Sequence, residues 1–341
     1  MFRKHPYLIN VFLLLIALVF SVALGAVYIP PGTIAGILVA KIPGIEIQSF
    51  WPDSSNAIVW FVRLPHTLLI AITGAALAGS GAAYQGLFRN PLADPYLIGV
   101  ASGAGLGAVA TMAFRGTGDL WGYYLIPAGA FLGALITILA VYFLAKVGSM
   151  VPLTSLILSG VAIGTFASAL TSFIMLRSDD QIYRAISFLL GGSTMTGWKP
   201  VLGAIPYMVL GLGLLVLSGH VLNVLQFGED QASQLGLSVE RAKAFVIVTA
   251  SLTTAVAVAF SGVIGFVGLI VPHMVRILWG ADYRRLIPLS LIGGASILLL
   301  ADLLARIVLA PQTLPVGIVT ALAGTPFFIW ILRRAKSEVF W

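Results

Sequence analysis

Apolar runs of about 20 residues recur along the whole chain and are separated by short polar turns. Each run is long enough to cross a hydrocarbon core of about 30 Å as one α-helix. The period-two alternation that the strands of a membrane barrel require is absent. We therefore expect an all-α, polytopic membrane protein that forms a single transmembrane domain over residues 1–341. The pattern predicts ten helices, at roughly 8–28, 63–85, 95–114, 121–145, 153–176, 199–219, 241–260, 263–279, 287–309 and 314–333.

Two of the outer connections are too elaborate for plain loops. Residues 29–62 contain two proline-glycine turns, and we expect a short helix there on the outer side. Residues 177–198 contain the stretch from Gln181 to Leu190, which is followed by two glycines. This stretch predicts a second short helix on the same side.

Charge is scarce along the chain. Only 9% of the residues are charged, against about 25% in soluble domains, which excludes a soluble protein. The net charge of +7 indicates lysine and arginine retained on cytoplasmic loops rather than a nucleic-acid partner. With the N-terminus inside, twelve of these residues fall on inner segments and seven on outer ones. This asymmetry predicts that both termini are cytoplasmic.

The N-terminal segment allows two interpretations. Arg3 and Lys4 precede the apolar run from Leu8 to Tyr28, as in a secretory signal peptide. The run is longer than the about 7–15 apolar residues of a signal peptide, so we expect a retained first helix.

The segment from Ser80 to Ala108 places a polar turn, Arg89 to Pro95, between two apolar stretches rich in glycine and alanine. Broken backbone between glycine-lined helices is typical of a path through a membrane protein. Within it, a glycine recurs every four residues, at Gly99, Gly103 and Gly107. We expect this stripe to serve close helix packing, with a smooth wall for a bulky solute as the alternative.

A weak internal repeat accompanies this segment. Ser80-Gly81 is followed by Pro91 at the same spacing at which Ser261-Gly262 is followed by Pro272. The first set lies near the inner end of one predicted helix and the second near the outer end of another. Such an arrangement is expected of the inverted-topology repeats of transporters.

The sequence offers no internal source of energy for transport. No acidic residue stands alone in the middle of a predicted span, where a proton- or sodium-coupled carrier needs one. Asp302 and Arg306 are four residues apart, so we expect them to pair, with Arg306 turned outward to a partner as the alternative. No GxxxxGK[ST] motif occurs, and the four histidines are scattered. We therefore expect ATP and Mg²⁺ to bind to a partner ATPase, and no cofactor or metal to bind to this chain.

The inner loop 220–243 is the candidate for contact with that partner. Glu229 and Asp230 follow Gly228, where acidic residues stabilise a helix N-terminus, and Gly236 is suited to end the helix. Ser238 can cap the next helix. We expect two short helices joined by a tight turn, forming a rigid docking element.

Long segments of the chain resemble the FecCD-type permeases of ABC importers, which take up ferric siderophores, haem and cobalamin. The segments are RLPHTLLIAITGAALAGSGAAYQGLFRNPLADPYLIGVASGAG, GEDQASQLGLSVERAK, SGVIGFVGLIVPHMVRILWGADYRRLIPLS and ADLLARIVLAPQTLPVGIVTALAGTPFFIWILRR. The resemblance implies the inverted-repeat fold of type II importer permeases, with ten helices. It also implies a homodimer around a central path, two ABC ATPase subunits, an extracytoplasmic substrate-binding protein and an iron-chelate substrate. The location would be the lipid of a bacterial or archaeal cytoplasmic (inner) membrane, crossed several times.

The resemblance also assigns roles to residues of this chain. The cytoplasmic gates match Asn90, Pro91 and Leu92, and Pro152, Leu153 and Thr154. The elements that couple to the ATPase match Gly228, Glu229, Asp230, Gln234, Leu235 and Gly236.

Docking to the binding protein is implied for Arg63 and Arg306. The family's RLPR reads RLPH here, so His66 replaces an arginine of the same surface. Thr313 stands where many members carry a glutamate, and no functional conclusion follows from that change.

Two other functions compete with an importer permease. A secondary carrier or channel would transport a bulky solute without nucleotide, and a membrane-embedded enzyme would need a convergent acid, base or nucleophile, which is not visible. The residues of the predicted spans do not separate siderophore from haem or cobalamin. The breadth of the family favours a ferric siderophore.

Overall fold

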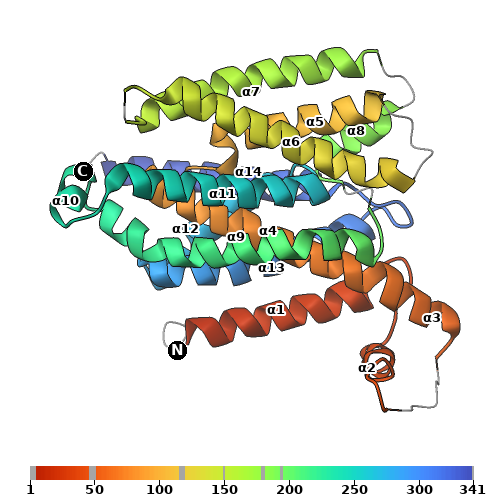
Figure 1. The fold of residues 1–341 in the computed structure, drawn as a ribbon. Helices are drawn as coiled ribbons and strands as arrows, with labels where there is room; N and C mark the ends of the chain where they lie inside the picture. The colour runs from red at the N-terminus through yellow and green to blue at the C-terminus, as the bar shows by residue number, and fades with distance from the viewer. Residues whose placement is uncertain are drawn as a thin grey trace.

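The computed structural model describes residues 5–45, 51–114, 120–148, 150–177, 181–192 and 195–339. Figure 1 shows a bundle of long helices, with α10 at one end and α2, α3 and α8 at the other. Arg3, Lys4 and Arg115, which contribute to the predicted orientation, lie outside the described residues. The helices are α1 Pro6–Ala23, α2 Pro31–Val39, α3 Asp53–Ala57, α4 Leu64–Leu87, α5 Val100–Phe114, α6 Leu120–Ala145, α7 Leu153–Met175, α8 Ile182–Leu189, α9 Trp198–Leu225, α10 Glu229–Gln234, α11 Val239–Ser261, α12 Val267–Trp279, α13 Tyr283–Ile307 and α14 Val316–Val339.

The predicted all-α fold is confirmed, and each of the ten predicted segments coincides with a helix. Among the described residues, seven helices are long and apolar enough to cross a membrane. Three shorter apolar helices, α5, α12 and the part of α14 over Val316–Ile331, accompany them. The predicted short helices in the two outer connections are also present, as α2 and α8.

Three predicted helix starts differ from the structure by four or five residues: α13 begins at Tyr283 rather than 287, and two other helices begin later than predicted. The third helix begins at Val100 rather than 95, because Pro95–Ile98 form a 3₁₀ turn and Gly99 takes a left-handed φ of 78°. The eighth begins at Val267 rather than 263, because the backbone leaves helical geometry between Gly262 and Phe266. Apolar side chains continue through both breaks, so the length of an apolar run does not reveal them.

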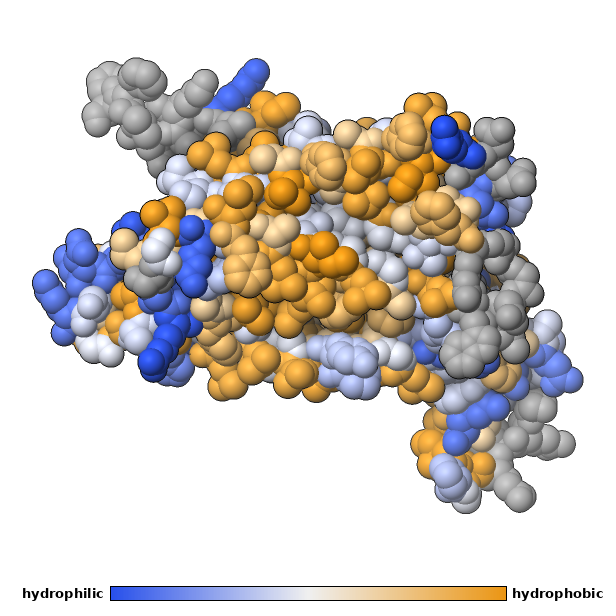
Figure 2. All heavy atoms as spheres, turned by 45° about the horizontal axis from the view of Figure 1, so that its top comes forward, coloured by the Kyte–Doolittle hydropathy of each residue, from blue (hydrophilic) through white to orange (hydrophobic). Residues whose placement is uncertain are grey.

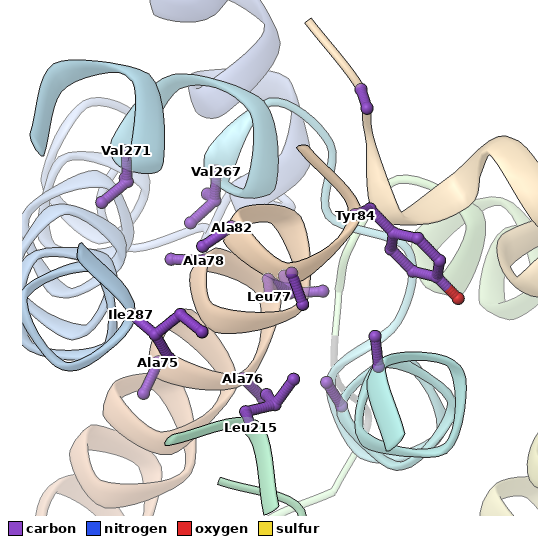
Figure 3. Packing of buried hydrophobic residues seen from close by; sticks show 14 of the residues in the cluster. Ala75, Ala76, Leu77, Ala78, Ala82, Tyr84, Leu215, Val267, Val271 and Ile287 are labelled. Carbon is purple, nitrogen blue, oxygen red and sulfur yellow. The ribbon is translucent and has the colours of Figure 1, made fainter. Parts of the chain in front are cut away.

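Helix α4 lies at the centre of the bundle and packs against α9, α11, α12 and α13. Nearly all of its residues are buried, and many are glycine or alanine. A Cβ atom on Gly74 would lie 2.3 Å from the carbonyl oxygen of Gly294, so only glycine permits this approach of α4 to α13. Figure 3 shows the small side chains of α4 facing larger ones of its neighbours: Ala75, Ala76, Ala78 and Ala82 lie among Leu215, Val267, Val271 and Ile287.

The glycine stripe of the third predicted helix is a packing seam between α5 and α6. A Cβ atom on Gly103 would lie 2.6 Å from the carbonyl oxygen of Gly133, and one on Gly107 would lie 2.0 Å from that of Gly129. Gly99 precedes α5 and lies against Thr137 of α6 and Gly160 of α7. The packing interpretation of these three glycines is therefore the one that the structure supports.

The outside of the bundle carries a broad apolar band. Figure 2 shows this band on one face, with hydrophilic residues gathered at both ends, including the α10 end. Large side chains such as Ile136 on α6, Phe166 on α7 and Leu210 on α9 are exposed within the chain. Such a band is the surface that lipid covers in a membrane protein. Helix α1 packs against α13 and is part of the fold.

The two sets of residues in the suggested repeat differ in local structure. Ser80 and Gly81 lie inside α4, and Pro91 lies in the turn that follows. Ser261 and Gly262 instead end α11, and Pro272 lies inside α12. The matched spacing therefore does not mark equivalent positions.

Candidate functional site

A cavity of about 280 Å³ opens among α4, α8, α13 and the start of α14, and contains all three residues predicted to dock a binding protein. Arg63, His66 and Arg306 line it together with Asp302, and Thr313 lies at its edge. Residues brought together here are up to 254 positions apart, from 62 to 316. We call this the outer cavity.

Asp302 is the centre of charge in the outer cavity. Its Oδ1 lies 2.8 Å from His66 Nε2, and its Oδ2 lies 2.9 Å from Arg306 Nε. Asp302 is only 4% exposed, whereas the His66 side chain is 31% exposed. The predicted pairing of Asp302 with Arg306 is present, and His66 joins it as a third member. A buried carboxylate between two basic side chains is compensated in charge.

The two outer arginines also hold the C-terminal end of α1. Arg306 Nη1 donates to the Ser21 carbonyl at 3.1 Å, and Arg63 Nη1 donates to the Val22 and Ala23 carbonyls at 2.7 and 2.9 Å. The last carbonyls of a helix lack intrahelical partners and carry partial negative charge, so cations stabilise this end. Arg63 is buried, and its guanidinium is committed to these carbonyls.

Tyr96 secures the break between α11 and α12, a role that the sequence did not indicate. Its hydroxyl donates to the Ile264 carbonyl at 2.9 Å and accepts the Ile264 N–H at 3.1 Å. The Val263 N–H donates to the Phe188 carbonyl of α8 at 3.0 Å. Non-helical backbone inside a membrane bundle requires such partners, because lipid offers none.

The first predicted gate is an ordered turn. Asn90 Oδ1 accepts the Leu92 N–H at 2.9 Å, which closes a turn around Pro91. Two residues later, Asp94 Oδ1 accepts the Tyr96 N–H at 2.8 Å and starts the 3₁₀ turn. Burial raises the pKa of Asp94 to about 6, because the charged carboxylate is poorly solvated there.

The second predicted gate is the start of α7. Pro152 is the residue before the helix, and Leu153 and Thr154 form its first turn. The adjacent Val151 N–H donates to Glu240 Oε2 of α11 at 3.1 Å. The gate segment is therefore tied to the helix that follows α10.

The predicted coupling loop contains one short helix, not two. Helix α10 covers Glu229–Gln234, and the second expected helix is the first turn of α11. Gly228 and Gly236 bound α10 with φ values of 106° and 86°, conformations that favour glycine. Leu235 is 68% exposed at the end of α10.

Lys243 is a second residue that the sequence pattern did not single out. Its ammonium lies 3.1 Å from Glu229 Oε2 of α10 and 2.7 Å from Glu240 Oε1. In the sequence, a lysine near the inner end of a span is interpreted as a cytoplasmic charge under the positive-inside rule. The burial of the Lys243 side chain is therefore not apparent from the sequence. No group of three His, Asp or Glu residues suited to a metal ion occurs in the part of the chain that the structure describes.

The chain matches known proteins along nearly its whole length, including both ends of the bundle. The family model of the FecCD transport family matches residues 13–334. The chain is 43% identical to the cobalamin import system permease protein BtuC of Halobacterium salinarum, over 83% of this chain and 75% of the relative. It is 39% identical to the hemin transport system permease protein HmuU of Yersinia pestis, over 86% and 90%. A solved inward-facing conformation of a metal-chelate type ABC transporter matches with a TM-score of 0.81 and 30% identity, over 96% and 98%.

Proposed function

Because the chain belongs to the FecCD transport family, we propose that it is the permease subunit of an ABC importer that carries an iron chelate, driven by ATP hydrolysis on a partner subunit. A ferric siderophore is the first candidate, with haem and cobalamin as the others. The names of the relatives, for cobalamin and hemin, and the metal-chelate neighbour support this substrate class.

The observation that carries the proposal is the separation of two differently built ends. The end with the outer cavity presents basic side chains, and the opposite end presents α10 with its exposed Leu235. A chain that works alone has no use for a projecting helix bounded by two glycines. A chain that receives force from an ATPase needs such an element.

At the outer end, His66 and Arg306 are the proposed contacts for acidic residues of a substrate-binding protein. His66 is partly exposed, and the Arg306 side chain is 14% exposed. Arg63 supports the same surface from below, since it fixes the end of α1 beneath it. Complementary charge at such a surface governs orientation and association rate.

At the inner end, α10 would dock on the ATPase, and the turn Asn90–Pro91–Leu92 and the start of α7 would act as gates. The assembly would contain two copies of this chain and two ATPase subunits. In this proposal α10 and both termini lie in the cytoplasm, and the multi-pass bundle lies in the inner membrane. Substrate would pass by alternating access as ATP is bound and hydrolysed.

The decisive test is transport in proteoliposomes that contain this chain, its cognate ATPase and its cognate binding protein. We expect uptake of a labelled iron chelate only with ATP on the ATPase side. The ligand retained by the purified binding protein identifies the substrate among siderophore, haem and cobalamin. Uptake by this chain alone, without nucleotide, would establish the secondary carrier instead.

A second test addresses the coupling end. Deleting residues 229–236 should leave the ATPase unable to drive uptake, because the docking helix is removed. Full ATP-driven uptake by the deletion variant contradicts the role of α10. An intact outer cavity, checked by binding-protein pull-down, controls for misfolding.

A further inference from the structure

Lys243 is a buried cation at the inner end of α11, and the proposed function assigns it no role. It is 3% exposed, although it lies one turn from the start of the helix. A lysine in this position normally extends into water along its flexible stem. Here the ammonium is turned inward and held between two carboxylates.

The two carboxylates belong to different elements. Glu229 is the first residue of α10, and both of its carboxylate oxygens lie within 3.2 Å of Lys243 Nζ. Glu240 is in the first turn of α11, and its Oε1 lies 2.7 Å from the same atom. Lys243 therefore joins α10 to α11 through one ammonium group.

The contact continues from Glu240 to the start of α7. The other oxygen of Glu240, Oε2, accepts the backbone N–H of Val151 at 3.1 Å. Val151 directly precedes Pro152 and the first turn of α7. One uninterrupted chain of polar contacts thus runs from α10 through Lys243 and Glu240 to the gate segment.

The burial of the cation explains why this chain of contacts acts as a link. Removing one partner of a buried charge is strongly unfavourable, because the remaining charge is left without compensation. Lys243 is buried while both glutamates are at least one-third exposed. A displacement of α10 that separated Glu229 from Lys243 would leave the cation undercompensated, so α11 and the Val151 backbone are biased to follow α10.

We propose that Lys243 is a positioning residue that makes the start of α7 follow the movement of α10. The inference rests on the proposed function, since it takes α10 to be the element on which an ATPase acts. Lys243 contacts no substrate in this proposal. Its role is to hold two glutamates together so that a displacement at one reaches the other.

The test is Lys243→Met in the reconstituted complex of permease, ATPase and binding protein. We expect ATP hydrolysis to continue while chelate uptake per ATP falls by at least about fivefold, the lower end of typical coupling between two sites. Lys243→Arg keeps the charge and should restore most of the uptake per ATP. Unchanged uptake per ATP in Lys243→Met overturns the proposal.

Two further variants separate this role from simple destabilisation. Glu229→Gln with Glu240→Gln keeps the shape of both side chains but removes both negative charges and leaves each side chain one acceptor oxygen instead of two, and should reproduce the loss. Lys146→Met is the matched control for Lys243→Met, because Lys146 is an exposed lysine just beyond α6 and makes no ion pair with any described residue. A loss in Lys146→Met equal to that in Lys243→Met overturns the proposal.

A structural readout completes the experiment without relying on transport. Hydrogen exchange of the Val151 amide is measured in the complex with and without trapped ATP. We expect the exchange rate to change with nucleotide in the wild type and not in Lys243→Met. If the wild-type complex shows no ATP-dependent uptake at all, the proposed function fails. If uptake is normal but the exchange rate of the Val151 amide does not change with nucleotide, only this inference fails.

Discussion

The outer cavity and the inner end of the bundle both rely on buried charge, but they use it differently. At the outer end, Arg63 and Arg306 bond to the backbone carbonyls of α1, so the charges are fixed to the main chain of one neighbour. At the inner end, Lys243 is bonded to two side chains from separate elements. The outer arginines are therefore anchored directly to backbone, whereas the Lys243 ammonium is held by side chains.

This difference in bonding indicates which end of the bundle can change its conformation. A guanidinium held by successive carbonyls at a helix end has little freedom, because its planar donors match several fixed acceptors. The Lys243 ammonium is bonded only to side chains among the described residues, so it can move together with the two glutamates that compensate it. We therefore expect the outer end to keep its shape as a docking surface and the inner end to rearrange.

The largest effect that tests this comparison is expected from Asp302→Ala. The change leaves the Arg306 guanidinium, only 14% exposed, without its acidic partner and should destabilise the fold by roughly 3–5 kcal/mol. Glu240→Gln at the inner end should cost no more than about 1 kcal/mol, because Glu229 still compensates Lys243 and the Glu240 carboxylate is partly exposed. Thermal unfolding in detergent measures both, and equal losses would contradict the contrast between the ends.

Tyr96→Phe tests the non-helical break between α11 and α12. Loss of the hydroxyl leaves the N–H and the carbonyl of Ile264 without their partner, at a cost of about 1–3 kcal/mol. Hydrogen exchange at the Ile264 amide should rise along with the fall in the unfolding temperature. Tyr207→Phe on the exposed face of α9 is the matched control. An unchanged Ile264 amide would show that the break does not need Tyr96.

Asp94 gives the inner end a dependence on pH. Its pKa in the fold, about 6, lies above the ordinary value of about 3.9, so the folded state favours the neutral carboxyl. The contribution of Asp94 to the free energy of unfolding is complete below about pH 4 and is lost as the pH rises through about 6. The loss amounts to about 1–2 kcal/mol, after allowance for the partial exposure of the side chain. Asp94→Asn keeps the acceptor for the Tyr96 N–H and should gain stability over the wild type at pH 8 but not at pH 4. A stability difference that is the same at both pH values would contradict this assignment.

The smallest effect is expected from His66→Arg at the rim of the outer cavity. A permanent charge beside Asp302 should tighten docking of the binding protein by no more than about fivefold, since a partly exposed ion pair contributes at most about 1 kcal/mol. Surface-based binding measurements at two salt concentrations provide the readout. Arg177→Gln, a charge change on an exposed outer residue away from the cavity, should leave the affinity unchanged. Weaker docking in His66→Arg would place the contact elsewhere.

Most of the fold follows from the sequence because hydrocarbon thickness sets the length of each apolar run. The ten segments, the short helices α2 and α8, and the pairing of Asp302 with Arg306 follow from local spacing alone. The break before α12 does not, since its backbone partners are Tyr96 and Phe188, which lie far away along the chain. A pattern read from neighbouring residues cannot identify hydrogen-bond partners that are distant in the sequence.

The same limit applies to the candidate sites. Arg63 looks like an outward-facing cation in the sequence, yet its guanidinium is occupied by carbonyls some 40 positions earlier. Lys243 looks like one more inner positive charge in the sequence. Its ion pair with Glu229 forms because α10 folds back on α11, and local spacing does not predict this contact. Gly103 and Gly107 fit a wall or a seam equally well until the opposite glycines of α6 are located.

The bond from Arg306 to Ser21 also has a consequence for how the chain is made. The two residues are separated by 285 positions, which at about 5–20 residues per second corresponds to a delay of roughly 15–60 s during synthesis. Until α13 emerges, the carbonyls at the C-terminal end of α1 lack Arg306 and are held by Arg63 and by the Ile29 N–H. The C-terminal end of α1 is thus completed only after α13 has been made, and α1 stays open to rearrangement until then.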